Sequence, residues 1–412
     1  CRSPRSAARR SCSRSTSTPL ELFFDLTFVV AIAQAASSLH HGLVEGDSRR
    51  SIAAYVATFL AIWWAWMNFT WFASAYDNDD APYRLAVFAQ MVGVLVLAAG
   101  VSRAFTEEDL GVMIAGYVIM RLAMVSLWLR AAAGHPERRA TALRYAIGIA
   151  ALQLFWVARL VLPDNITVIG FLLFAICEMA VPVWAERAGP TPWHPEHIAE
   201  RYGLFTIIVL GESILSATVG VQAALDASGT LAELGTVIAG GLLIVFALWW
   251  IYFDQPTATL LEATHAEREL RPAGVFIWGY AHYVVFGSVA ATGAGLAIAI
   301  YQSTGHSSLT DTQAALAINV PISIYLLVVW LLHRRHDTRR RWQNPAVPLI
   351  VIAVMITSLT TISVLLTGVI VAAYAAALAL TTEESTANDR PAHPTRSRFG
   401  TERSSAPSTD RA

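Results

Sequence analysis

The segment TPLELFFDLTFVVAIAQ, residues 18–34, begins an apolar run of membrane-spanning length, yet it carries two acids, Glu21 and Asp25, in its first two turns. Apolar blocks of about 20 residues, the length that crosses about 30 Å of hydrocarbon, recur along the whole chain. Hydrophobic residues make up 55% of the sequence and charged residues only 14%, and the mean hydropathy is +0.50. The sequence therefore predicts an all-α, polytopic transmembrane helix bundle.

The apolar blocks predict spans near residues 20–41, 52–75, 83–104, 109–130, 142–162, 165–186, 200–221, 233–253, 275–301 and 313–333. The last apolar run, 346–380, is too long for one helix, and the polar residues Thr360, Thr361 and Ser363 predict a break between two short ones. This gives about 12 spans. Halves at 18–186 and 200–381 are joined by a linker at 187–199 and flanked by tails, 1–17 and 382–412, that we expect to be disordered.

The distribution of arginine predicts the orientation, since every basic residue of the chain other than histidine is arginine. If about 12 helices alternate, the clusters at 2–14, 130–144, 333–342 and beyond 390 all lie on one side, together with Arg187, Arg201, Arg268 and Arg271. The opposite loops carry only Arg49, Arg50 and Arg103. Arginine-rich loops stay in the cytoplasm, so we expect the N-terminus and the C-terminus to be cytoplasmic.

A weak internal similarity predicts a duplicated bundle. Laying the seventh span on the first with a shift of 179 residues pairs Glu21 with Glu200 and Thr27 with Thr206. WWAWMNFT at 63–70 likewise matches WWIYFDQPT at 249–257. Because each half has an even number of spans, the two halves would form a 6+6 parallel internal repeat.

Three stretches together resemble the bacterial low temperature requirement protein A family: ELFFDLTFVVAIAQ at 21–34, ERYGLFTIIVLGESIL at 200–215 and ALWWIYFD at 247–254. WMNFTWFASAYDNDD at 66–80 and the pair Tyr280 and His282 look like further landmarks of that family. The resemblance covers roughly residues 18–380. It implies a polytopic protein of the bacterial cytoplasmic membrane, linked by name to growth in the cold, and it implies no particular reaction.

The two acids of the first span call for different interpretations. Thr18 followed by Glu21 fits a capping box, and an acid in the first turn gains roughly 0.3–1 kcal/mol from the helix dipole, so Glu21 is expected to be structural. Asp25 lies beyond the reach of the cap. A buried ionisable group in a membrane is by default functional, and we favour that interpretation over a structural hydrogen bond to Trp64 or Asn68.

Depth along the helices places Asp25, Asn68, Gln90, Asp254 and His282 in the cytoplasmic half of the bilayer. A lipid-facing carboxylate or amide would cost several kcal/mol without a partner. We therefore expect these side chains to line a polar vestibule that opens to the cytoplasm. For His282, packing by hydrogen bonds and proton transfer both remain open.

A second group, Arg121, Glu178 and Glu212, lies near the middle of the bilayer. Arg121 and Glu178 are expected to form a structural ion pair between two helices of the first half. Glu212 is then left without a basic partner, so it should hold a proton or bind a cation. Its neighbours Gly211 and Ser213 would allow close helix approach and add a hydroxyl ligand.

Other kinds of site are not supported by the sequence. Cys1, Cys12 and Cys177 form no disulfide or zinc framework. His194, His197 and Glu200 lack a fourth ligand, so no metal site is expected. The chain has no glycine-rich phosphate loop and no Ser-His-Asp arrangement, which argues against an enzyme and against a cofactor. The arginines are sorted by the bilayer, so we expect no nucleic-acid partner.

The function that fits these patterns is a secondary transporter or permease whose ion or proton coupling rests on Glu212 and Asp25. Its partners would be the lipid bilayer and an unidentified small solute. Two alternatives remain open: a cation channel, and a non-transporting membrane protein that supports growth in the cold.

Overall fold

A computed structural model describes residues 17–161, 167–226, 231–254, 273–303, 309–334 and 343–388. Within these ranges the chain forms α-helices and two short 3-10 turns, and no strands. The twelve α-helices are α1 (Pro19–Val44), α2 (Ser48–Tyr76), α3 (Ala81–Thr106), α4 (Gly111–Gly134), α5 (Arg139–Ala158), α6 (Thr167–Glu186), α7 (Pro195–Asp226), α8 (Leu231–Phe253), α10 (Ala273–Ser303), α11 (Asp311–His333), α12 (Gln343–Thr357) and α13 (Ser363–Asn388). Among the described residues, ten helices are long and apolar enough to cross a membrane. The finer expectation of 12 spans remains a prediction.

Several helices begin where their capping residues dictate. The predicted capping box of Thr18 and Glu21 is present at the start of α1, and Thr310 forms a second one with Gln313 at α11. Asp80 caps α3, and Arg130 donates to its Oδ2 at 2.6 Å. This hydrogen bond lowers the pKa of the Asp80 carboxyl below its usual value.

Two helix boundaries differ from the sequence expectation. The seventh span was expected from residue 200, but α7 begins at Pro195, because proline fits the first turn, where its missing N–H is not needed. The linker after α6 is correspondingly shorter than 187–199. At the other end of the chain, α13 continues to Asn388 and so takes in the first part of the expected tail at 382–412. The predicted break in the last apolar run is confirmed by the turn between α12 and α13.

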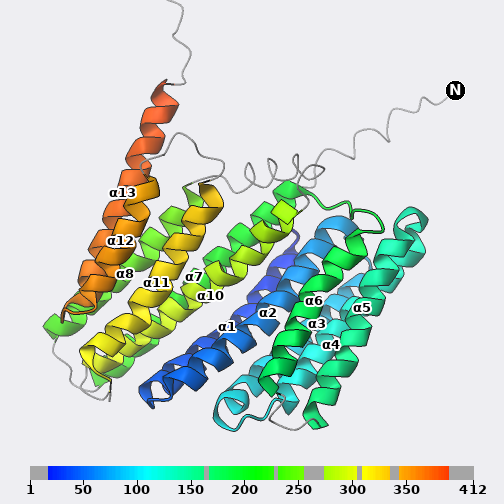
Figure 1. Ribbon diagram of the computed structural model, residues 1–412, viewed down its shortest axis with the longest axis horizontal. Coiled ribbons are helices and arrows are strands. Elements are labelled where there is room, and N and C mark those ends of the chain that lie inside the picture. Colours follow the sequence, from blue (N-terminus) through cyan, green and yellow to red (C-terminus); the bar gives the residue numbers. More distant parts are fainter. Residues whose placement is uncertain are drawn as a thin grey trace, which may run out of the picture.

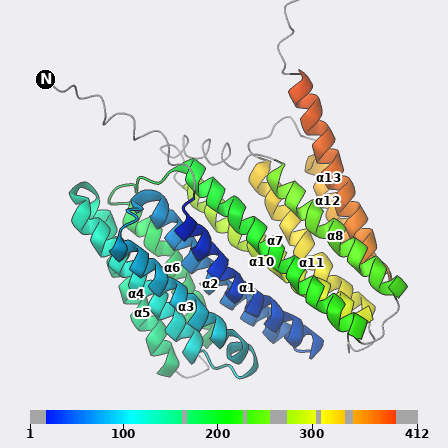
Figure 2. The same cartoon turned by 180° about the vertical axis from the view of Figure 1, so that it is seen from behind.

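The helices form two groups, α1–α6 and α7–α13, that meet along α1, α2, α7 and α10 (Figure 1). Seen from the other side, α1 and α7 run in the same direction (Figure 2). In the first group α1 packs on α2 and α3, and α3 to α6 pack in sequence; in the second group α7 packs on α8 and α10, and α10 to α13 pack in sequence. The similar neighbour order agrees with a duplication, although the contact between α8 and α13 has no strong counterpart between α2 and α6. The 6+6 repeat therefore remains a prediction.

The interior of the bundle is aromatic and the outer surface is apolar. Trp63, Trp64 and Trp66 of α2 are at most 2% exposed. By contrast, Leu85 and Leu154 are 67% and 74% exposed. Large exposed apolar side chains are what a surface in contact with lipid requires.

Candidate functional site

A buried ionic centre lies where the two helix groups meet. Asp25 of α1 and Arg201 of α7 are both fully buried, and they form a two-point contact. Arg201 Nη2 donates to Asp25 Oδ1 at 2.6 Å and Nε donates to Oδ2 at 3.0 Å. This bidentate geometry is the strongest form of an arginine–carboxylate pair. We refer to Glu21, Asp25, His197 and Arg201 as the seam centre.

Glu21 joins the seam centre in addition to capping α1. Its Oε1 lies 2.8 Å from Arg201 Nη1, while its Oε2 accepts from Thr18 at 2.8 Å and lies 3.3 Å from His197 Nε2. Glu21 has the capping role expected from the sequence. Its carboxylate also contacts His197 and Arg201 of α7. The centre thus holds two carboxylates, one guanidinium and the imidazole of His197. Uncompensated charge in a bilayer is costly, so each acid of α1 depends on its partner in α7.

The register of α1 and α7 explains how this centre assembles. Glu21 and His197 are 176 residues apart, and so are Asp25 and Arg201. Within each helix the two residues are four positions apart and therefore share one face. Because the helices run in the same direction from Pro19 and Pro195, each acid of α1 meets a basic residue at the same depth of α7. The 179-residue shift inferred from sequence therefore differs from the register of these contacts.

Asp25 does not bond to Trp64 or Asn68, the partners considered from sequence. Its additional donor is Trp66 Nε1, at 2.7 Å from Oδ1. The Trp66 ring stacks on Phe205 of α7 with centroids 4.0 Å apart. Residues 64 and 66 of a helix point about 200° apart, so only Trp66 faces α1 and α7.

The predicted ion pair between Arg121 and Glu178 is present in the interior of the first helix group. Glu178 also accepts from Trp64 Nε1 at 2.7 Å, Trp156 Nε1 at 3.2 Å and Gln153 Nε2 at 3.3 Å. All of these groups donate to the Glu178 carboxylate. The contacts join α2, α4, α5 and α6 and point to a structural role for the pair.

Glu212 of α7 is buried, and no base contacts it among the described residues. Its Oε1 accepts from Ser216 Oγ at 3.0 Å, whereas Oε2 is buried without a hydrogen-bond partner. The expectation for Gly211 was wrong, since nothing lies within 4 Å of a Cβ built there. The close approach to α10 is instead made by Ser213, whose Cα lies 2.9 Å from a Cβ built at Gly293. Ser213 Oγ donates to Val289 O and is not directed to a ligand.

The other predicted vestibule residues are dispersed. Asn68 Nδ2 donates to Trp64 O at 2.8 Å within its own helix. Gln90 is buried in α3, and its Nε2 has no partner in the described part of the chain. Asp254 follows the last residue of α8 and is half-buried. The contact of Asn68 stays within α2, and the single polar vestibule shared by these residues remains a prediction.

His282 is a packing residue in this structure. Its Nδ1 lies 2.8 Å from Trp278 O, and its Nε2 lies 3.1 Å from Tyr252 Oη. A carbonyl can only accept, so Nδ1 carries the proton and Nε2 accepts from the tyrosine. Both ring nitrogens are therefore occupied, which favours packing over proton transfer.

An aromatic cavity of about 1260 Å³ opens near the seam centre. It lies where α2 and α6 end and α10 begins, and Asn68 is the predicted vestibule residue that lines it. Glu186, Arg187 and Thr191 supply further polar groups. Its aromatic lining includes Trp71, Phe72, Trp128, Tyr145, Trp193 and Tyr280.

A hydrogen bond joins the wall of this cavity to α7 beside the seam centre. Trp71, a residue of the cavity wall, donates to Tyr202 Oη at 3.0 Å, and Tyr202 follows Arg201 in α7. The cavity wall therefore contacts α7 one residue beyond the guanidinium. We regard the seam centre and the aromatic cavity together as the candidate site.

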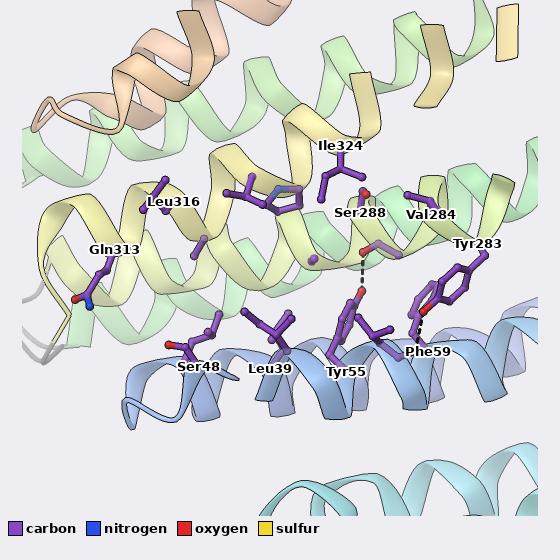
Figure 3. Close-up of a pocket in the computed structure, with 18 of the residues that line it drawn as sticks. Leu39, Ser48, Tyr55, Phe59, Tyr283, Val284, Ser288, Gln313, Leu316 and Ile324 are labelled. Atoms are coloured by element: carbon purple, nitrogen blue, oxygen red, sulfur yellow. Dashed lines mark hydrogen bonds between the residues drawn. The ribbon is translucent and has the colours of Figure 1, made fainter. Parts of the chain in front are cut away.

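A second cavity, of about 440 Å³, lies on the boundary of the two helix groups (Figure 3). Tyr55 donates to Gly287 O at 2.6 Å and Tyr283 to Val56 O at 2.7 Å, so these bonds join α2 to α10 beside it. Its lining is apolar, and Ser48 and Gln313 are among its few polar residues. A polar solute would lose its hydration there without new partners, so the aromatic cavity is the better binding site.

Sequence reasoning missed two members of the seam centre, Arg201 and His197. Arg201 was counted among the basic residues of the cytoplasmic side because the seventh span was expected to begin at residue 200, and His197 was considered only as a metal ligand. The available signal was Pro195, which marks the start of the helix. With that start, His197 and Arg201 occupy the same positions in α7 as Glu21 and Asp25 in α1.

The all-helical bundle, with ten helices of membrane-spanning character and buried ion pairs, defines a multi-pass membrane protein. The model of the bacterial low temperature requirement A protein (LtrA) family matches residues 16–380, and the chain belongs to this family. The family expected from the sequence motifs is thereby confirmed. The chain is also similar to the Rhizobium meliloti protein named Uncharacterized protein RA0937, with 28% identity over 286 residues, which are 67% of each chain.

Proposed function

We propose that this protein is a secondary transporter or permease of the bacterial cytoplasmic membrane, and that its ion or proton coupling involves the seam centre. The observation that carries the proposal is the contact of Asp25 and Glu21 with Arg201, because it joins the two helix groups through a charge centre with one carboxylate in excess. Unlike the pair of Arg121 and Glu178, which lies within the first helix group, this contact joins helices of both groups. Movement of one helix group against the other would change this contact.

The aromatic cavity is the proposed entry for the solute. It suits an organic molecule with an apolar or aromatic body, which the rings would cover, and a polar end near Asn68, Glu186 or Thr191. Glu212 is a second proposed coupling residue, since its Oε2 lacks a partner. The remaining partner in this proposal is the bilayer, with both termini on the cytoplasmic side.

Flux through proteoliposomes tests the proposal. Wild-type protein and the Asp25→Asn variant are reconstituted with a pH-sensitive dye inside, and a panel of amino acids, aromatic amines and aromatic acids is added under an imposed proton or sodium gradient. We expect saturable, solute-dependent flux that Asp25→Asn abolishes and Gly211→Ala retains. Ohmic current without saturation would indicate a cation channel instead. No flux of either kind would favour a structural protein that supports growth in the cold.

A further inference from the structure

A buried polar cluster lies beneath the turn between α12 and α13, away from the seam centre. Asn319 lies within α11 and is fully buried. Side chains at the end of α12 and the start of α13 surround it. The turn above it is exposed, with Leu359 78% exposed. Figure 1 shows α12 and α13 as a hairpin beside α8 and α11. The cluster consists of Asn319, Val354 O, Thr357, Ser358, Ser363 and Thr367.

The cluster has more close polar contacts than protons. Four oxygens surround Asn319 Nδ2 at 2.8–3.1 Å, but an amide nitrogen carries only two protons. Thr357 Oγ1 also contacts Val354 O at 2.7 Å, Ser363 Oγ at 3.2 Å and Thr367 Oγ1 at 2.8 Å. Thr367 Oγ1 in turn donates to Asn319 Oδ1 at 2.9 Å. These eight contacts share six protons, two from the amide and one from each of the four hydroxyls.

We propose that this cluster binds a small monovalent cation such as sodium. The ligands would be one amide oxygen, the Val354 carbonyl and the four hydroxyls, with the Asn319 amide turned so that Oδ1 takes the place of Nδ2. The two ends of a carboxamide can exchange in this way. An ion among these oxygens would contact lone pairs that the two amide protons cannot reach.

The chemistry of the ligands selects the charge of the ion. Divalent calcium and magnesium take carboxylate ligands, and none of the cluster side chains is acidic. The last turn of α12, whose Val354 carbonyl belongs to the cluster, adds the partial negative charge of a helix C-terminal end. Broken membrane helices bind sodium with such carbonyls and helix C-terminal ends. A single positive charge therefore matches the site.

Thermal unfolding of the purified full-length protein in detergent tests this proposal. Midpoints are compared in sodium chloride and in choline chloride at equal ionic strength. We expect the unfolding midpoint to rise with the sodium concentration. Once that concentration exceeds the dissociation constant for sodium, each tenfold increase in it should raise the midpoint by about the same amount. The rise should be lost in Ser363→Ala and in Thr367→Val. It should persist in the control Thr292→Val, which removes a buried hydroxyl bonded to Ser288 O within α10.

Binding of radioactive sodium to the wild-type protein gives a second measurement that does not depend on how well the variants fold. We expect saturable binding that excess unlabelled sodium displaces and choline does not. The proposal is overturned if wild-type protein shows no saturable binding, or if the two ligand variants keep the full sodium-dependent rise. In either case the hydrogen bonds of the cluster have only a structural role, which is to hold α11, α12 and α13 together. Neither measurement requires a transport assay, so the result is independent of the proposed function.

Discussion

At the scale of single residues, the surroundings of Glu178 decide which substitutions the buried pair tolerates. Arg121→Ala leaves the carboxylate without its cation and should cost about 3–5 kcal/mol of folding free energy. Sequence alone suggests that exchanging the two charges would restore the pair. The structure predicts that the exchange fails, because Trp64 and Trp156 would then donate toward a guanidinium, which accepts nothing.

The matched comparison for this prediction is Arg121→Met combined with Glu178→Gln. The glutamine oxygen still accepts from the tryptophans, and no charge remains, so this variant should fold better than either the exchange or Arg121→Ala. Folded yield and thermal midpoint in detergent provide the measurement. An exchanged pair as stable as the wild type would show that the indole hydrogen bonds to Glu178 contribute little.

For Glu212 we predict a loss of activity without a loss of folding stability. Glu212→Gln imitates the protonated carboxyl and can keep the bond from Ser216, whose hydroxyl donates to Oε1. We expect the variant to fold and reach the membrane normally but to lose gradient-coupled flux and growth in the cold. Complementation of a deletion strain at low temperature, scored beside membrane abundance, is the measurement. Full rescue would remove Glu212 from the mechanism.

At the scale of helices, close packing depends on glycines at backbone contacts. A Cβ at Gly116 would lie 2.3 Å from Leu97 N and 2.5 Å from Gly93 O. Backbone atoms cannot move aside as a side chain can, so Gly116→Ala should separate α3 from α4 and cost about 1–3 kcal/mol. Gly211→Ala is the control, with open space around it. The measurement is the thermal unfolding midpoint of each variant. If Gly116→Ala and Gly211→Ala unfold at the same midpoint, the close contact at Gly116 contributes little to stability.

Helices were the part of the fold that the sequence predicted best. Apolar length and capping residues found the spans, and Thr360, Thr361 and Ser363 marked the last break, because these signals are local. The seam centre could not be derived in the same way. Arg201 lies 176 residues from Asp25, and the error of a few residues in the start of α7 placed it at the edge of the expected span instead of inside the bundle. The pair of Arg121 and Glu178 was found because depth alone brings them together.

At the scale of the whole molecule, orientation is the main prediction. With both termini cytoplasmic, a reporter active only in the periplasm should give signal when fused after residue 305. Fusions after residue 338 or 385 should give none, because each position follows one or three further membrane crossings. A periplasmic signal at residue 385 would contradict the 12-span topology.

The long separation between the partners of the seam centre also sets an order of events during synthesis. Arg201 is made 176 residues after Asp25, which corresponds to about 10–35 seconds of translation. Arg121 and Glu178 are only 57 residues apart, and both are made before Arg201. The acids of α1 therefore lack the Arg201 guanidinium until α7 has been synthesised, so the seam centre can form only after both partners of the first ion pair are in the chain.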